Sequence, residues 1–241
     1  MGGRVSAAIA VAVAGCIGAG SVWAASDTDG MARLILFSGI DLWRNGEFVH
    51  GGVLWSPGGL DREGFSFKGM ISGGSYRYIS GALGNAEVTG TELTAQFMPG
   101  WRFKAGKTEL KLFAGADLQN HRLTPDDLSS GLRGSDLGLR AAFDFWSEPT
   151  QSTMLAADGT LSSIATSYSI RAAAGWRFAD RFYAGPEVQA LASDGYRQRR
   201  IGLHIIGLKT GDFEWSAAAG WARDTDDRSG VYFKLGVLTR R

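Results

Sequence analysis

Apolar and polar side chains alternate with a period of two over most of this chain. In the last stretch the apolar set falls on every second position: Val231, Phe233, Leu235 and Val237. Such alternation places apolar residues on one face of a β-strand and polar residues on the other. No stretch sustains the 3.6-residue period of an amphipathic helix. The sequence therefore predicts an all-β chain.

Turn residues divide the alternating region into twelve predicted strands, although a count of ten to twelve fits the pattern. Tight turns are predicted where glycine, asparagine or aspartate interrupts the alternation, as at Arg44-Asn45-Gly46 and Ala179-Asp180. The strands are predicted over 32–43, 47–57, 64–80, 86–103, 107–119, 134–146, 152–158, 163–178, 181–192, 196–209, 211–224 and 229–239.

The first 24 residues are predicted to be a secretory signal peptide. Arg4 is their only charge, a small-residue apolar run follows it, and Val22-Trp23-Ala24 resembles a cleavage site before Ala25. The alternative is lipoprotein processing at Cys16, the only cysteine, which would leave an apolar stretch on the mature chain. We expect one domain over residues 25–241.

Strand length and charge placement distinguish a membrane barrel from a soluble sandwich. Several predicted strands exceed the 9 to 11 or so residues that cross a bilayer at a tilt. Their polar faces carry charges of both signs at mid-strand: Lys111, Arg140, Asp144, Arg171, Glu187, His204, Glu214 and Lys234. Charge and glycine inside with apolar residues outside is typical of a lipid-spanning barrel. The predicted fold is an antiparallel up-and-down transmembrane β-barrel.

Aromatic residues near strand ends fit the girdles that such barrels place at both membrane interfaces. The predicted girdle comprises Trp43, Trp55, Tyr76, Tyr78, Trp101, Phe103, Trp146, Trp176, Phe178, Tyr183, Trp215 and Trp221. If both termini are periplasmic, the strand number must be even, and twelve strands place the short turns on one side and the longer segments 120–133 and 224–229 on the outer side.

Composition excludes several other classes of protein. The 25 basic and 24 acidic residues nearly cancel, so no nucleic-acid partner is expected. A single cysteine and three histidines argue against a disulfide framework and a transition-metal site. We expect no cofactor.

Short stretches spread over the mature chain resemble a known family. They include Glu148-Pro149-Thr150, Gly185-Pro186-Glu187, Asp194-Gly195-Tyr196-Arg197-Gln198 and Gly220-Trp221-Ala222-Arg223-Asp224. In these stretches the chain resembles the BcsS-type cellulose biosynthesis proteins. The resemblance implies an exported envelope protein that assists cellulose production. It carries no catalytic residue over to this chain.

His204 is the one histidine with plausible catalytic neighbours, because Glu214 and Ser216 lie on the next predicted strand. A lipid- or glycan-directed enzyme would use a histidine near a serine and a carboxylate. We expect instead a histidine inside the barrel that is bonded to Glu214. Arg171 and Glu187 belong to the same set of interior charges, and we expect opposite charges there to pair across the interior.

Two further polar clusters near the predicted outer loops are binding candidates. Asp224, Asp226 and Asp227 offer calcium-like oxygens without the spacing of an EF-hand, so a solvated loop is expected. The second cluster is a basic run: Tyr196, Arg197, Arg199 and Arg200. Cross-strand pairs between this run and the acidic loop are expected. The alternative is contact with lipopolysaccharide phosphates or an extruded glycan.

Together these features predict a non-enzymatic outer-membrane barrel that assists cellulose biosynthesis or secretion. Its expected partners are outer-membrane lipid or lipopolysaccharide, and cellulose or other proteins of the cellulose-synthase system. A small porin-like channel, a surface enzyme around His204 and a purely structural barrel are the alternatives. Conductance would separate a channel from a structural barrel.

The first prediction concerns location. Because the alternating strands present an apolar exterior, the protein should fractionate with the outer membrane and show heat-modifiable migration in gels. Recovery from the soluble periplasmic fraction without detergent would contradict this prediction.

Overall fold

The computed structural model describes residues 32–194 and 196–241, and most of them form β-strands. The predicted signal segment 1–24 and Cys16 lie outside the described residues. The strands are β1 (Leu34–Trp43), β2 (Gly46–Trp55), β3 (Gly64–Ser80), β4 (Ala86–Ala105), β5 (Thr108–Thr124), β6 (Gly134–Ser147), β7 (Thr153–Ser162), β8 (Ser167–Phe178), β9 (Phe182–Ser193), β10 (Tyr196–Thr210), β11 (Phe213–Asp224) and β12 (Ser229–Arg240).

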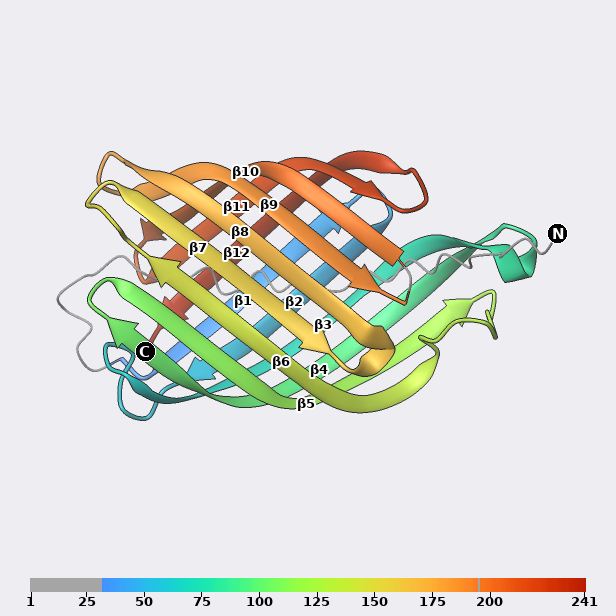
Figure 1. Cartoon of the computed structure of the whole chain (residues 1–241), viewed down its shortest axis with the longest axis horizontal. Helices are drawn as coiled ribbons and strands as arrows, with labels where there is room; N and C mark the ends of the chain where they lie inside the picture. Colours follow the sequence, from blue (N-terminus) through green and yellow to red (C-terminus); the bar gives the residue numbers. More distant parts are fainter. Residues whose placement is uncertain (1–31, 195) are drawn as a thin grey trace.

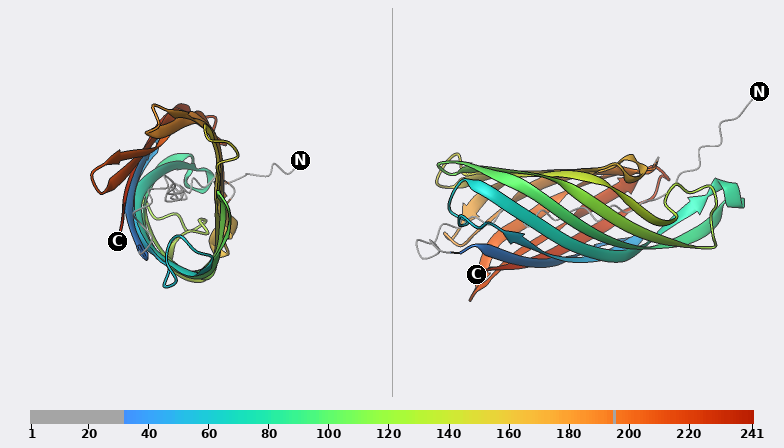
Figure 2. Two further views of the ribbon diagram at one scale, coloured as in Figure 1. Left: turned by 90° about the vertical axis from the view of Figure 1, so that its left-hand side faces the viewer. Right: turned by 90° about the horizontal axis from the view of Figure 1, so that it is seen from below.

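The twelve strands close into a single antiparallel barrel in which each strand pairs with its neighbours in the chain. The ring closes between β1 and β12, with Ile35 opposite Arg240 and Trp43 opposite Tyr232. Figure 1 shows the strands tilted across the long axis, and the end-on view of Figure 2 shows the closed outline. The predicted barrel class and the count of twelve strands are confirmed.

The two faces of each strand are those that the alternation predicts. Large apolar side chains cover the outside, among them Leu139, Ile201 and Leu203 at 73%, 64% and 68% exposure. The predicted mid-strand charges, such as Arg171 and Lys234, are buried on the inner face. The apolar belt faces the lipid chains, and the closed sheet leaves no strand edge with unpaired backbone groups. No helix in the described part of the chain is long and apolar enough to cross a membrane.

The predicted aromatic girdle is wrong for five residues, because they point into the barrel: Trp43, Tyr76, Tyr78, Trp146 and Tyr183. The outward-facing members include Trp55, Trp101, Phe103, Trp176, Phe178 and Trp221. Position near a strand end gives the depth of a side chain, but the parity of its position along the strand decides which face it occupies.

We call the barrel end that carries the start of β1 and the end of β12 the proximal end, and the opposite end the distal end. Arg241 accepts a backbone hydrogen bond from Leu34 there, at 2.8 Å. Two-residue turns at 106–107 and 211–212 are proximal, and the nine-residue loop 125–133 is distal, as predicted. The β3–β4 hairpin, with the 3₁₀ turn η1 (Gly81–Leu83), projects farthest at the distal end (Figure 2).

The connection 56–63 departs from the predicted pattern, since it has eight residues yet lies at the proximal end. Its Leu60 is buried in an apolar cluster with Ile35, Leu54 and Met98. The Arg102 guanidinium donates to the Leu60 carbonyl oxygen. This connection is therefore part of the barrel interior rather than a surface turn.

Three smaller features also differ from the sequence prediction. β5 continues to Thr124 and β7 to Ser162, both beyond the predicted ends. Residues 164–166, predicted as the start of a strand, form the 3₁₀ turn η2 (Ile164–Thr166), in which Ala165 and Thr166 have positive φ. A strand continues as long as the neighbouring strand supplies hydrogen-bond partners for its backbone. The sequence of one strand does not show where its neighbour ends.

Glycine spacing reveals a close approach of strands in the barrel wall. Gly220 lies opposite Gly202, and a Cβ atom at Gly220 would overlap the Ile201 carbonyl oxygen and the Gly202 Cα. A side chain at Gly220 or at Gly115 would therefore meet the backbone of the adjacent strand.

The second prediction tests the outward face. Ala217→Arg places a charge in the apolar belt at mid-strand and should lower the free energy of unfolding by about 2–4 kcal/mol. Ala217→Leu keeps the face apolar and should have little effect. Urea unfolding of the barrel folded into phospholipid vesicles measures both. Leu112→Arg repeats the test on β5. Equal stability of the arginine and leucine variants would show that the faces are assigned wrongly.

Candidate functional site

The middle of the barrel interior is a network of buried ion pairs. Arg171 on β8 donates to Asp158 on β7 at 2.7 Å and to Glu187 on β9 at 3.1 Å. Arg200 contacts both carboxylate oxygens of Asp41 at 2.8 Å. A buried charge without a partner is costly, so these pairs explain how so many ionised groups share the interior.

Opposite interior charges pair as predicted, among them Arg140 with Asp117 at 2.8 Å and Arg171 with Glu187. The prediction that they pair across the interior is wrong, because these pairs join neighbouring strands. Two further pairs involve predicted interior charges. Lys111 binds Glu109 at 2.9 Å, and Asp144 binds Lys68 at 3.2 Å. Among the described residues, the ion pairs within the network join strands no more than three positions apart around the ring.

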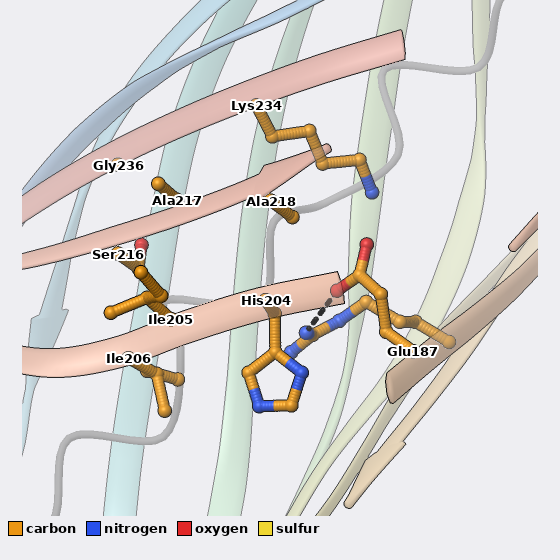
Figure 3. Close-up of a pocket in the computed structure, with 10 residues that line it drawn as sticks. Glu187, His204, Ile205, Ile206, Ser216, Ala217, Ala218, Lys234 and Gly236 are labelled. Atoms are coloured by element: carbon orange, nitrogen blue, oxygen red, sulfur yellow. Dashed lines mark hydrogen bonds and ion pairs between the residues drawn. The ribbon is translucent and has the colours of Figure 1, made fainter. Parts of the chain in front are cut away.

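His204 lies in this network, but its expected bond to Glu214 is wrong. The β10–β11 register places His204 opposite Ala218, whereas Glu214 lies opposite Lys209 and binds Arg240 at 3.2 Å. Figure 3 shows His204, Glu187 and Lys234 directed toward the same interior space. The cavity they line with Arg171 and Ser216 has a volume of about 20 Å³, which is enough for one water molecule.

The environment of His204 does not assemble a catalytic triad. Neither of its ring nitrogens has a hydrogen-bond partner among the described residues. A serine hydrolase needs a serine–histidine hydrogen bond and a carboxylate that orients the ring. Glu187 is instead engaged by Arg171 and by the Tyr232 hydroxyl, which donates to it at 2.9 Å.

The basic run at the start of β10 is divided between the two faces of the wall. Tyr196 and Arg200 point inward and are buried, whereas Arg197 and Arg199 are exposed on the outside. The expected cross-strand pairs with the acidic loop are wrong, because Arg199 lies opposite Arg223 and Gln198 opposite Asp224. A one-residue difference in register exchanges the face and the partner of every side chain.

The acidic segment after β11 is a hydrogen-bonded turn. The Asp224 carboxylate accepts the backbone N–H groups of Asp226 and Arg228 and the Arg228 guanidinium, at 2.9–3.0 Å. Burial raises the pKa of Asp226, and the nearby Arg228 opposes that shift. The Asp227 side chain is 84% exposed and pairs with Arg223 at 2.8 Å. The expected solvated loop is thus correct for Asp227 and wrong for the buried Asp224.

No group of three or more metal-ligating His, Cys, Asp or Glu side chains occurs in residues 32–194 and 196–241. The carboxylate of Asp224 binds the turn's own backbone and Arg228, that of Asp226 pairs with Arg228, and that of Asp227 pairs with Arg223. Their arrangement stabilises the β11–β12 connection.

The distal mouth of the barrel is lined by aromatic side chains that the sequence analysis assigned to the membrane interface or, for Tyr196, to the basic run, or did not single out. Six of them form part of one buried cluster: Trp43, Phe48, Tyr76, Tyr78, Tyr196 and Tyr232. Leu132 of the loop 125–133 packs into the same cluster and is fully buried. Inward parity near the distal strand ends is the sequence signal that could have located this cluster.

The loop 125–133 is held across the mouth by bonds to both sides. The Tyr78 hydroxyl donates to Asp127 at 3.1 Å, and the backbone N–H of Gly131 donates to Asp194 at 2.9 Å. Burial opposes ionisation of Asp127, but hydrogen bonds led by that from Ser129 outweigh it and lower the pKa. Asp127 thus holds the loop at neutral pH, and this contribution is lost as acidification protonates the carboxylate.

Comparison with known proteins identifies the family. The model of the family described as "Cellulose biosynthesis protein BcsS" matches residues 35–241. The chain belongs to the BcsS family. The resemblance in its short motifs is therefore confirmed. A comparison with curated protein sequences finds no match.

Solved structures share the fold of this BcsS-family chain. The COG4313 outer membrane channel from Pseudomonas putida F1 has a TM-score of 0.55 at 9% identity, covering 92% of this chain and 98% of that one. The transport unit of the autotransporter AIDA-I from Escherichia coli has a TM-score of 0.50 at 9% identity, covering 92% and 94%. With its lipid-facing belt, this BcsS-family protein is an outer-membrane barrel.

The third prediction concerns the ion-pair network. Arg171→Ala leaves Asp158 and Glu187 buried without their shared cation and should lower the free energy of unfolding by about 3–5 kcal/mol. Arg181→Ala removes an exposed arginine from the proximal β8–β9 turn and serves as the control. Denaturant unfolding in vesicles compares them. Equal stability of the two variants would mean that the interior pairs contribute nothing.

Proposed function

We propose that this BcsS-family barrel is a non-enzymatic accessory of cellulose biosynthesis that acts at the cell surface through its distal loops. One observation carries the proposal: the loop 125–133 and the aromatic cluster occupy the distal mouth, so the loops rather than an open bore meet the exterior. Leu128 on that loop is 77% exposed and offers an apolar contact to a partner. The partners are cellulose and other proteins of the cellulose-synthase system.

The interior supports a role without catalysis. Arg171, Glu187 and Arg200 are engaged in ion pairs that stabilise the wall, and His204 lacks a hydrogen-bonded serine. The opposite charges of these groups neutralise one another, and their contacts link nearby strands of the wall. The proposal assigns binding to the surface of the distal end.

A narrow channel is the second candidate. The ion pairs of the interior network, among the described residues, link strands at most three positions apart, so they run along the wall and do not join opposite sides. Rearrangement of the mouth loop would then open a path along the barrel axis. Ion conductance distinguishes this candidate from the accessory role.

The fourth prediction tests the distal loops. Replacing residues 125–133 with a short Gly-Ser linker, which is flexible and has small side chains, and shortening 225–228 should reduce cellulose retained at the cell surface. Each variant is expressed in a strain lacking the native gene, and bound cellulose is measured by dye retention. Heat-modifiable migration checks that the barrel still folds.

Two control variants sharpen this experiment. His204→Asn should leave cellulose retention unchanged, since the proposal gives the imidazole no catalytic role. Shortening the proximal connection 148–152 should also have little effect. Unchanged cellulose in the distal-loop variants, together with steady conductance of the purified protein in planar bilayers, would refute the accessory role in favour of a channel.

A further inference from the structure

Three arginines gather on the outer surface near the distal end. Arg197 and Arg199 project outward from β10, and Arg223 projects outward from the neighbouring β11. Inward-facing residues separate them along each strand, since Gln198, Arg200 and Asp224 are buried. We call Arg197, Arg199 and Arg223 the arginine patch.

The charges of the arginine patch are largely unneutralised. Arg199 lies directly opposite Arg223 in the strand register, and like charges in that position repel. Arg223 pairs with Asp227, but both side chains are at least 70% exposed, and such pairs contribute little. In the described chain, no carboxylate forms a salt bridge with Arg197 or Arg199.

The patch lies at the edge of the apolar belt. The next outward residue on β10 is Ile201, about 7 Å from Arg199 at the usual rise per strand residue, and Leu203 follows it. Val188 lies beside Ile201 on β9, and Trp221 lies beside it on β11. All four apolar side chains are more than half exposed.

The residues opposite Arg197 and Arg199 on β9 are small, Ala192 and Ala190, and offer the guanidinium groups no carboxylate partner. A ligand with an anionic head and apolar tails could therefore seat its head on the guanidinium groups while its tails follow Ile201 and Leu203. A guanidinium group can donate two hydrogen bonds to one phosphate, so Arg suits this ligand better than Lys does.

We propose that the arginine patch binds the phosphorylated headgroup of a glycolipid in the surrounding membrane leaflet. The phosphates contact Arg197, Arg199 and Arg223, and the acyl chains lie along Val188, Ile201, Leu203 and Trp221. The ligand offsets the repulsion between Arg199 and Arg223. This site goes beyond the proposed function, because it requires neither cellulose nor the mouth loop, and it assigns the distal end to the leaflet that holds phosphorylated glycolipid.

Native mass spectrometry of the detergent-solubilised full chain tests the site with diphosphorylated lipid A as the probe. The double variant Arg199→Gln/Arg223→Gln should bind about tenfold more weakly or worse, since it loses two charge-assisted contacts. Arg181→Gln, at the proximal end, should bind like the wild type. Equal binding by the double variant and the wild type would overturn the proposal.

A second variant keeps the test decisive if the double variant folds poorly. Asp227→Asn frees Arg223 from its exposed carboxylate and should strengthen lipid A binding, and unchanged or weaker binding would count against the site. Two further probes identify the ligand chemistry. Lipid A stripped of its phosphates should bind more weakly to the wild type. If inorganic phosphate at millimolar concentration displaces diphosphorylated lipid A completely, the patch is a simple anion site and the glycolipid proposal fails.

Discussion

Closure of the sheet between β1 and β12 is the interaction on which the remaining structure depends. A bilayer offers no hydrogen bonds to a strand edge, so every backbone group in the apolar belt must find its partner within the barrel. The β1–β12 pairing, which runs from Ile35–Arg240 to Trp43–Tyr232, removes the last open edge. Once the ring is closed, the parity of each position decides whether a side chain meets lipid or the interior. The placement of charge, aromatic residues and binding groups follows from that division.

Closure of the wall buries charged side chains in the barrel interior, where an unpaired charge is costly. Many ionised side chains share a small buried volume, and their cost falls only if each one finds an opposite charge or a hydrogen bond. The Arg171–Asp158–Glu187 and Arg200–Asp41 contacts do this by linking strands that are adjacent or three apart. These contacts engage the carboxylates near His204, so no carboxylate or serine in the described part of the chain is hydrogen-bonded to its imidazole.

The two ends of the barrel differ in a way that bears on function. At the proximal end, the 56–63 connection packs Leu60 inside among apolar residues. At the distal end, the loop 125–133 is tied to Tyr78 and Asp194 over an aromatic cluster. The distal exterior also carries the arginine patch above exposed Ile201 and Leu203. In this BcsS-family barrel the aromatic cluster on the inner surface and the arginine patch on the outer surface therefore lie at the same end.

The period-two pattern by itself determined the all-β class, a barrel of about twelve strands and the outward face of the alternating apolar residues, because strand geometry fixes side-chain direction at each step. It also predicted that opposite charges on the polar faces pair with one another, without giving their partners. Tertiary structure alone decided the rest. The Glu214–Arg240 and Arg200–Asp41 contacts, the opposition of Arg199 to Arg223 and the inward turn of Tyr76 and Tyr78 depend on strand register and ring closure. Register is set by hydrogen bonding between segments far apart in the chain, so a local pattern gives the face of a residue but not its partner.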